Sequence, residues 1–421
     1  MDTSSPVLFG SLLREARRRK GLSQAELGGD KYSGSYISHI ESGRRVATPE
    51  VIEFLSRRLG VSPLEWGVSP AADPAQLVVG DTIEDLLVAE RAWSEHDWAA
   101  AIKHSSQAAA IAEATGDAGR FWEASYVHGQ ALFSSGAFAE AAALGEMLAE
   151  HEVAQRFAVA RAQALSLAAT AHRASDHLGW AVAFAARAVE AASSAPPIIL
   201  AEALMALVSA MSEAGSTHTE TTPYLDRLGE LSPRLTSDHS RGTIAWTMGV
   251  AAYMAHEIDK GIALHEHARH WLDARRDFRL WSRFHSVAAR WRLNAGVLPG
   301  TEELIATADV GLRILGNSYD IVELRQVKAM YALRRGDPLD AARIMSEVLD
   351  DPILGGEHMS RGGSELLLGH AFNDLGKVDA ARERYARAAL QFEVEGRLRA
   401  AVNAWRRSVG QEVSETFLTQ G

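Results

Sequence analysis

Residues 21–43 read GLSQAELGGDKYSGSYISHIESG, and this stretch predicts two short helices joined by a tight turn. Ser23 is the expected N-cap of the first helix, and Glu26 follows three residues later as its capping-box partner. Residues 28–30 (Gly-Gly-Asp) then end that helix, because glycine is costly inside a helix and permissive in a turn. Ser33 provides a second N-cap, so we expect a second helix directly after it.

The second predicted helix is amphipathic. Tyr36, Ile37 and Ile40 form its expected buried stripe, and Gly43 is placed to end it. Small polar residues fill most other positions. A helix of this kind after a tight turn has the geometry that lies in the major groove of DNA.

Two segments, LSQAEL (22–27) and SGSYISHIESG (33–43), resemble the DNA-binding domain of the XRE (Cro/repressor) helix-turn-helix family. The resemblance extends over residues 8–63 and implies that the second helix reads base edges. A helical hairpin without a DNA role is the alternative interpretation.

This chain departs from the family in a slightly shorter turn and in Gly34, which has no side chain to read a base. Base readout is therefore expected from Ser35, Ser38 and His39, with a further contribution from DNA shape. The residues expected at the DNA interface are Ser23, Gln24, Ser33, Gly34, Ser35, Tyr36, Ser38, His39, Arg44 and Arg45.

Helices are also expected on both sides of this motif. The first covers residues 8–20, with Leu12, Leu13 and Ala16 inward. Another begins at Pro49 and ends at Gly60. We expect phosphate contacts from the basic, exposed end of the first helix, which comprises Arg14, Arg17, Arg18, Arg19 and Lys20. Thr48 should cap the later helix, and Leu64 and Trp66 should complete the small domain.

Charge is divided unevenly along the chain. Residues 1–70 hold ten Lys and Arg against eight Asp and Glu, a net charge of +2. The remainder holds 33 basic and 46 acidic residues, a net charge of −13. Phosphate binding follows local clusters rather than total charge, so a localised contact with double-stranded DNA fits this distribution.

The composition limits the classes of protein that this chain can represent. A length of 421 residues predicts two or more domains, and 47% hydrophobic residues are enough for a large core. Because there is no cysteine, disulfides, thiol catalysis and Cys-based zinc sites are excluded. Neither a signal-peptide core nor an apolar run near the ~20 residues of a membrane span is present. We therefore expect a cytoplasmic protein without membrane contact.

The chain divides into four expected parts: a head (1–67), a Pro- and Ala-containing linker (68–80), helical repeats (81–397) and a C-terminal capping helix (398–421). Short turns recur at about 40-residue intervals through the repeat region, which suggests about eight repeats. Strand-like alternation is absent there, so the expected fold class is all-α.

Two repeats match the tetratricopeptide (TPR) pattern. In WEASYVHGQALFSSGAFAEAA (122–142), Gly129 is the small residue where two helices approach and Gly136 forms the turn. In ELLLGHAFNDLGKVDAARERYARAA (365–389), Gly369 and Tyr385 take corresponding small and large positions. The resemblance implies a right-handed TPR-like α-solenoid behind the helix-turn-helix head.

Motifs for catalysis or cofactor binding are missing from the sequence. It contains no Walker loop, GxGxxG, GxSxG or HExxH motif. HEHARH (265–270) fails as a zinc motif, since Arg269 stands where the second histidine would be needed. We therefore predict no enzyme activity, no cofactor and no metal.

In TPR stacks the first helix of each repeat lines a concave groove. The matching positions here combine aromatic, amide and charged side chains, a mixture that suits an extended peptide. The expected effector-binding residues are Glu123, Tyr126, Gln130, Phe133, Trp246, Tyr253, Arg290, Asn294, Gln326, Arg334, His370 and Asn373.

A DNA-binding head followed by such an array resembles the Gram-positive peptide-pheromone receptors (RRNPP group). The resemblance implies a homodimer that binds a short signalling peptide and thereby changes its binding to a palindromic operator. Receptors of that group often hold the peptide backbone with several groove asparagines, whereas this chain has four in all, Asn294, Asn317, Asn373 and Asn403.

Three hypotheses follow for the function. The first is a transcription regulator gated by a peptide, and a small-molecule effector is its close variant. The second is a DNA-bound scaffold whose groove recruits a protein partner. An enzyme is the third, which the missing motifs disfavour.

Overall fold

The computed structural model describes residues 6–43, 45, 47–61, 82–351, 361–394, 396–411 and 413. The chain separates into two compact units, residues 1–80 and 81–421. Every regular element in the described parts is a helix, so the all-α prediction is confirmed. The expected linker (68–80), Leu64 and Trp66 lie outside the described residues.

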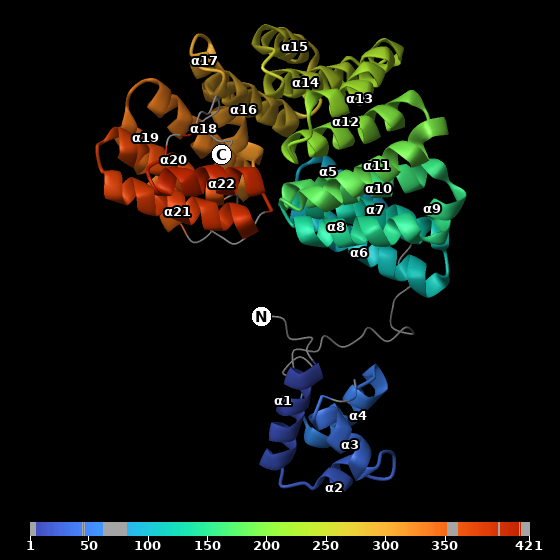
Figure 1. Cartoon of the computed structure of the whole chain (residues 1–421). Helices are drawn as coiled ribbons and strands as arrows, with labels where there is room; N and C mark the ends of the chain where they lie inside the picture. Colours follow the sequence, from blue (N-terminus) through green and yellow to red (C-terminus); the bar gives the residue numbers. More distant parts are fainter. Residues whose placement is uncertain are drawn as a thin grey trace. The chain divides into compact units, whose positions relative to one another are not determined.

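The described part of the first unit, which we call the head, has four helices (Figure 1): α1 Pro6–Arg19, α2 Gln24–Gly28, α3 Gly34–Glu41 and α4 Pro49–Leu59. Both expected N-caps form. The Ser23 hydroxyl accepts from the Glu26 amide and the Glu26 carboxylate accepts from the Ser23 amide, which completes the capping box. The Ser33 hydroxyl accepts from the Tyr36 amide. Thr48 precedes α4 without a side-chain cap bond.

The head core is built where the hydrophobic pattern places it. Leu13, Leu27, Ile37, Ile40 and Leu55 are fully buried together. Helix α3 begins so close to α2 that a side chain at residue 34 would contact its backbone. A Cβ there would lie 3.2 Å from the Ala25 nitrogen. Glycine at this position therefore serves the packing of the two helices.

The second unit, which we call the solenoid, is a succession of helices (Figure 1). Their bounds are α5 Thr82–Ser94, α6 Trp98–Thr115, α7 Ala118–Ser135, α8 Phe138–Glu150, α9 Glu152–Arg156, α10 Ala158–Ala174, α11 Leu178–Ala191, η2 Ala192–Ser194, α12 Pro197–Glu213, α13 His218–Leu231, η3 Ser232–Arg234, α14 Asp238–Met254, α15 Ile258–Trp271, α16 Phe278–Asn294, α17 Thr301–Leu315, α18 Ser318–Arg334, α19 Pro338–Asp350, α20 Arg361–Asp374, α21 Val378–Val394 and α22 Leu398–Ser408.

Consecutive long helices pack as pairs, and the first helices of neighbouring pairs also touch, as α10 with α12 and α16 with α18 do. The core continues from pair to pair: one cluster runs from α7 to α14 and another from α14 to α20. Small residues allow this packing. A Cβ at Gly369 would lie 2.6 Å from the Tyr385 ring, so the expected small–large contact forms. Helix α22 packs on α21 through Ala400, Ala401 and Ala404.

None of the helices in the described parts is long and apolar enough to span a bilayer.

Candidate DNA-binding surface and effector-binding groove

The exposed face of α3 carries the side chains expected to read DNA. Ser35 and His39 are exposed one turn apart, and Ser38 is half-buried beside them. Ile37 and Ile40 anchor the opposite face in the head core. The helix therefore presents a short row of hydrogen-bond donors and acceptors, and its position is fixed by the head core.

Arg45 lies beside this face and is held there by two contacts. Its guanidinium is 4.5 Å from the centroid of the Tyr36 ring, and its amide donates to the His39 carbonyl. Tyr36 in turn stacks on Tyr32, whose ring meets Phe54 edge-on. The Arg45 guanidinium thus packs on a group of contacting aromatic rings. Tyr36, which was expected at the DNA interface, contributes the ring that contacts the guanidinium. Arg44 lies outside the described residues.

Glu41, at the end of α3, is the buried polar centre of the head. Its carboxylate accepts from Arg17 Nε at 2.6 Å, Arg17 Nη2 at 3.0 Å and Gln24 Nε2 at 2.8 Å. Burial would raise the pKa of Glu41, but these hydrogen bonds and the Arg17 charge outweigh it and hold the pKa below its usual value. The network ties α1, α2 and α3 together.

The prediction for Arg17 was wrong: it is buried rather than part of an exposed basic end. A sequence signal was available, because Arg17 follows Leu13 by four residues and so continues the inward stripe of α1. Glu41 follows Ile37 in the same way. The Gln24 amide donates to Glu41, so one of its two N–H donors is already used within the head. Arg14, Arg18, Arg19 and Lys20 are exposed.

In the solenoid, side chains from distant helices face a common interior, which we call the inner face. Burial raises the pKa of Tyr126 in α7, and Glu202 in α12 raises it further. The Arg173 guanidinium in α10 donates to the Glu213 carboxylate in α12 at 2.7 Å, and the charge of Glu213 raises the pKa of Arg173. Tyr126 in α7 and Arg173 in α10 therefore each lie near a carboxylate of α12.

The expected groove residues with accessible side chains divide into two groups. Glu123 and Asn373 are exposed, whereas Tyr126, Gln130, Phe133 and Trp246 are half-buried. Tyr126 is well fixed, since its ring stacks on Trp122 at 5.2 Å and the Trp122 indole donates to the Leu148 carbonyl. Such a tyrosine presents a rigid edge to the inner face.

Three expected effector-binding residues are corrected by the structure. Tyr253 is fully buried, with its ring against His265 and Trp291. Asn294 is 1% exposed at the end of α16, and Gln326 is 3% exposed and donates to the Ser364 hydroxyl. None of the three offers a surface for a ligand.

The remaining expected residues have partners inside the solenoid. Arg290 pairs with Glu323 at 3.3 Å, and Arg334 donates to the carbonyls of Leu293 and Asn294 at the end of α16. His370 Nδ1 lies 3.1 Å from the Tyr385 hydroxyl. These side chains are half-buried, so each could serve a ligand only by sharing or leaving its present contact.

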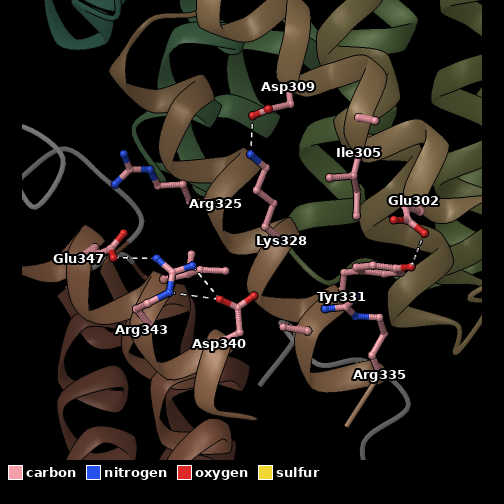
Figure 2. A pocket seen from close by; sticks show the side chains of 13 residues that line it. Glu302, Ile305, Asp309, Arg325, Lys328, Tyr331, Arg335, Asp340, Arg343 and Glu347 are labelled. Carbon is pink, nitrogen blue, oxygen red and sulfur yellow. Dashed lines mark hydrogen bonds and ion pairs between the residues drawn. The ribbon is translucent and has the colours of Figure 1, made fainter. Parts of the chain in front are cut away.

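A cleft of about 470 Å³ lies between α17, α18 and α19 (Figure 2). No sequence motif marks this cleft, and none of the expected effector-binding residues lines it. Its acids are paired: Lys328 contacts Asp309, Arg343 contacts both Asp340 and Glu347, and the Tyr331 hydroxyl contacts Glu302. Each acidic side chain that lines the cleft therefore has a hydrogen-bond or ion-pair partner within the cleft.

Within the described residues, no group of three or more His, Asp or Glu side chains is arranged to hold a metal ion. His265 of the near-miss motif is buried against α14, and burial lowers its pKa to about 3. It is therefore a neutral core residue near neutral pH.

The head matches a known type of DNA-binding domain, and the whole chain is similar to a solved structure. A family model described as a helix-turn-helix domain matches residues 8–66. The crystal structure of a Rap protein complexed with competence and sporulation factor is similar to this chain, with a TM-score of 0.54 and 13% identity. The match covers 93% of this chain and 97% of that chain, so the two share an arrangement of helices. No match is found among curated proteins.

Proposed function

We propose that this chain, a helix-turn-helix protein with a Rap-like helical fold, is a transcription regulator whose solenoid binds an effector that modulates DNA binding. The observation that carries the proposal is the exposed face of α3. Ser35 and His39 stand on an anchored helix, and Arg45 is held beside them. In DNA-binding proteins, contacts with phosphates position the protein and contacts with base edges determine the sequence that is bound. The α3 face offers short polar side chains for the bases and a fixed cation for a phosphate.

The effector site is assigned to the inner face around Tyr126 and Gln130. A rigid aromatic edge beside an amide group suits a peptide, whose backbone offers both donors and acceptors. The Rap structure is a complex with competence and sporulation factor, and its helical arrangement is similar. A short signalling peptide is therefore the effector class that we favour.

A homodimer on a palindromic operator is part of the proposal. The head is small, and a single module of this size buries little DNA surface. Two heads related by a two-fold axis would read half-sites about 34 Å apart. Light scattering of the free and DNA-bound protein tests the proposed homodimer. A monomeric mass in both states would contradict it.

The test of the effector site uses an extract of the native host that changes DNA binding by the wild type. Tyr126→Ala, Gln130→Ala, Trp246→Ala and Asn373→Ala should each weaken or abolish this response while unliganded DNA binding stays near the wild-type level. Tyr331→Ala is the matched control, because Tyr331 lines the separate cleft. If the four variants respond as the wild type does, the groove is not the sensor. The scaffold that recruits a protein partner would then be the better interpretation.

A further inference from the structure

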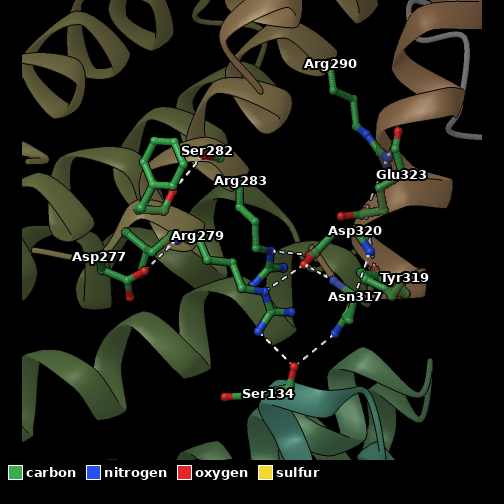
Figure 3. Close-up of polar contacts among 12 residues, drawn as sticks. Ser134, Asp277, Arg279, Ser282, Arg283, Arg290, Asn317, Tyr319, Asp320 and Glu323 are labelled. Atoms are coloured by element: carbon green, nitrogen blue, oxygen red, sulfur yellow. Dashed lines mark hydrogen bonds and ion pairs between the residues drawn. The ribbon is translucent and has the colours of Figure 1, made fainter. Parts of the chain in front are cut away.

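A contact inside the solenoid joins helices that are far apart in the chain (Figure 3). The Ser134 carbonyl, near the end of α7, accepts from Arg279 Nη1 at 2.9 Å and from Asn317 Nδ2 at 3.2 Å. Arg279 lies in α16 and Asn317 is the N-cap of α18. In a regular solenoid each helix pair contacts only its neighbours, so this contact closes a loop of several pairs.

Aromatic groups support the same junction. The Phe138 ring of α8 meets the Tyr319 ring edge-on, with centroids 5.6 Å apart. The Arg279 guanidinium lies 5.9 Å from the Trp98 ring of α6. Helices from the first third of the solenoid thus meet α16 and α18 through a few side chains and one main-chain carbonyl.

Asp320 holds the donors of this junction in place. Its side chain is fully buried and contacts Arg279 at 2.8 Å and Arg283 at 2.9 Å. It also accepts from the Asn317 amide in a capping box. The donors therefore belong to a rigid block on α16 and α18, whereas the Ser134 carbonyl belongs to the last turn of α7.

We propose that the contact of the Ser134 carbonyl with Arg279 and Asn317 is a latch that holds the solenoid in a closed form and can release it. The latch has few contacts compared with the continuous cores on either side, so it is the weak point of the closed form. Two packed blocks joined by a small interface behave as a two-state element rather than a continuously deformable one. The latch lies within the solenoid and requires neither DNA nor effector.

The test measures a distance across the latch by double electron–electron resonance. The chain has no cysteine, so spin labels can be placed through Glu140→Cys in α8 and Ile314→Cys in α17, both exposed. Two variants weaken the latch and keep the local fold. Asn317→Ser retains an N-cap oxygen but has no amide to reach Ser134. Arg279→Lys retains the charge beside Asp320, but its single ammonium cannot reproduce the planar fork that spans both acceptors.

The closed form predicts one narrow distance distribution for the otherwise wild-type chain and a longer, broader one for each latch variant. Arg343→Lys, which alters an ion-pair network at the separate cleft, should leave the distribution unchanged. A control label pair, Glu140→Cys with Glu190→Cys in α11, should report the same distance in every variant, which excludes general unfolding. If both latch variants keep the narrow wild-type distance, or if the wild type is already broad, the latch is refuted. The proposed DNA-binding function would be unaffected by that result.

Discussion

The head and the solenoid both bury a carboxylate beside arginine, but the two networks have different reach. In the head, Glu41 meets Arg17 at a separation of 24 residues, within one small core. In the solenoid, Asp320 holds Arg279, and Arg279 reaches Ser134 across 145 residues. The head network depends on three adjacent helices. The solenoid network depends on the packing angles of all the helix pairs between α7 and α16. A change in any of these angles can therefore alter the distance between Arg279 and Ser134.

The largest expected effect breaks the head network. Glu41→Ala leaves Arg17 buried without its partner, and loss of one member of a buried pair costs about 3–5 kcal/mol. Hydrogen exchange of the α1 and α3 amides should accelerate strongly, whereas exchange in α10 and α12 should not change.

Glu53→Ala is the control for that experiment, because Glu53 forms an exposed pair with Arg57. Its effect on exchange should be small. Equal protection of the head in the Glu41 variant and the wild type would show that the buried network does not hold the head together.

Acid should affect the solenoid through His265. The folded state keeps this imidazole neutral down to about pH 3, whereas the unfolded chain binds a proton near its ordinary pKa of 6.5. The contribution of His265 to stability is therefore intact above pH 6.5 and falls as the pH drops toward 3. The slope is at most about 1.4 kcal/mol per pH unit.

The variant His265→Leu should flatten this part of the stability curve, measured by denaturant unfolding between pH 7 and pH 4. His267→Leu should not, because His267 is exposed. A wild-type curve that is flat over this range would contradict the burial of a neutral His265.

Much of the head was predictable because its determinants are local. Ser23, Glu26 and Ser33 form their caps with residues three positions away, and the family match covers the same region. Arg17 was not predictable from its charge, because the burial of an arginine requires a partner such as Glu41, which lies 24 residues away.

The inner face was less predictable than the head. Tyr253 and Gln326 occupy the positions that the TPR pattern assigns to a groove, yet both are buried. Their exposure depends on how neighbouring helix pairs tilt, and no short stretch of sequence encodes that tilt. The contact of Ser134 with Arg279 was invisible for the same reason, since it joins helices that are distant in the chain.

The phosphate contacts of the head offer a prediction of intermediate size. Arg44→Ala combined with Arg45→Ala should weaken binding to all DNA sequences. It should also reduce the slope of log affinity against log salt by about two, because each phosphate contact releases about one counterion. A fluorescence-anisotropy titration at several salt concentrations measures both quantities. An unchanged slope would remove both arginines from the DNA interface.

The smallest expected effect concerns the aromatic support of Arg45. Tyr36→Leu removes the ring below the guanidinium, and the loss in DNA affinity should be about 0.5–1 kcal/mol, the scale of an exposed cation–π contact. Tyr36→Phe keeps the ring and should bind nearly as the wild type does. If Phe and Leu weaken binding equally, the Tyr36 hydroxyl rather than its ring is the group that matters.

The most direct test of the central claim is selection of binding sites by the full-length chain from a random double-stranded DNA library. We predict one enriched motif with two-fold symmetry. Ser35→Ala and His39→Ala should change the preferred bases within it, whereas the double Arg44 and Arg45 variant should lower affinity without changing the motif. Failure to enrich any motif, or the same motif at the same affinity for the Ser35 and His39 variants, would contradict base reading by α3.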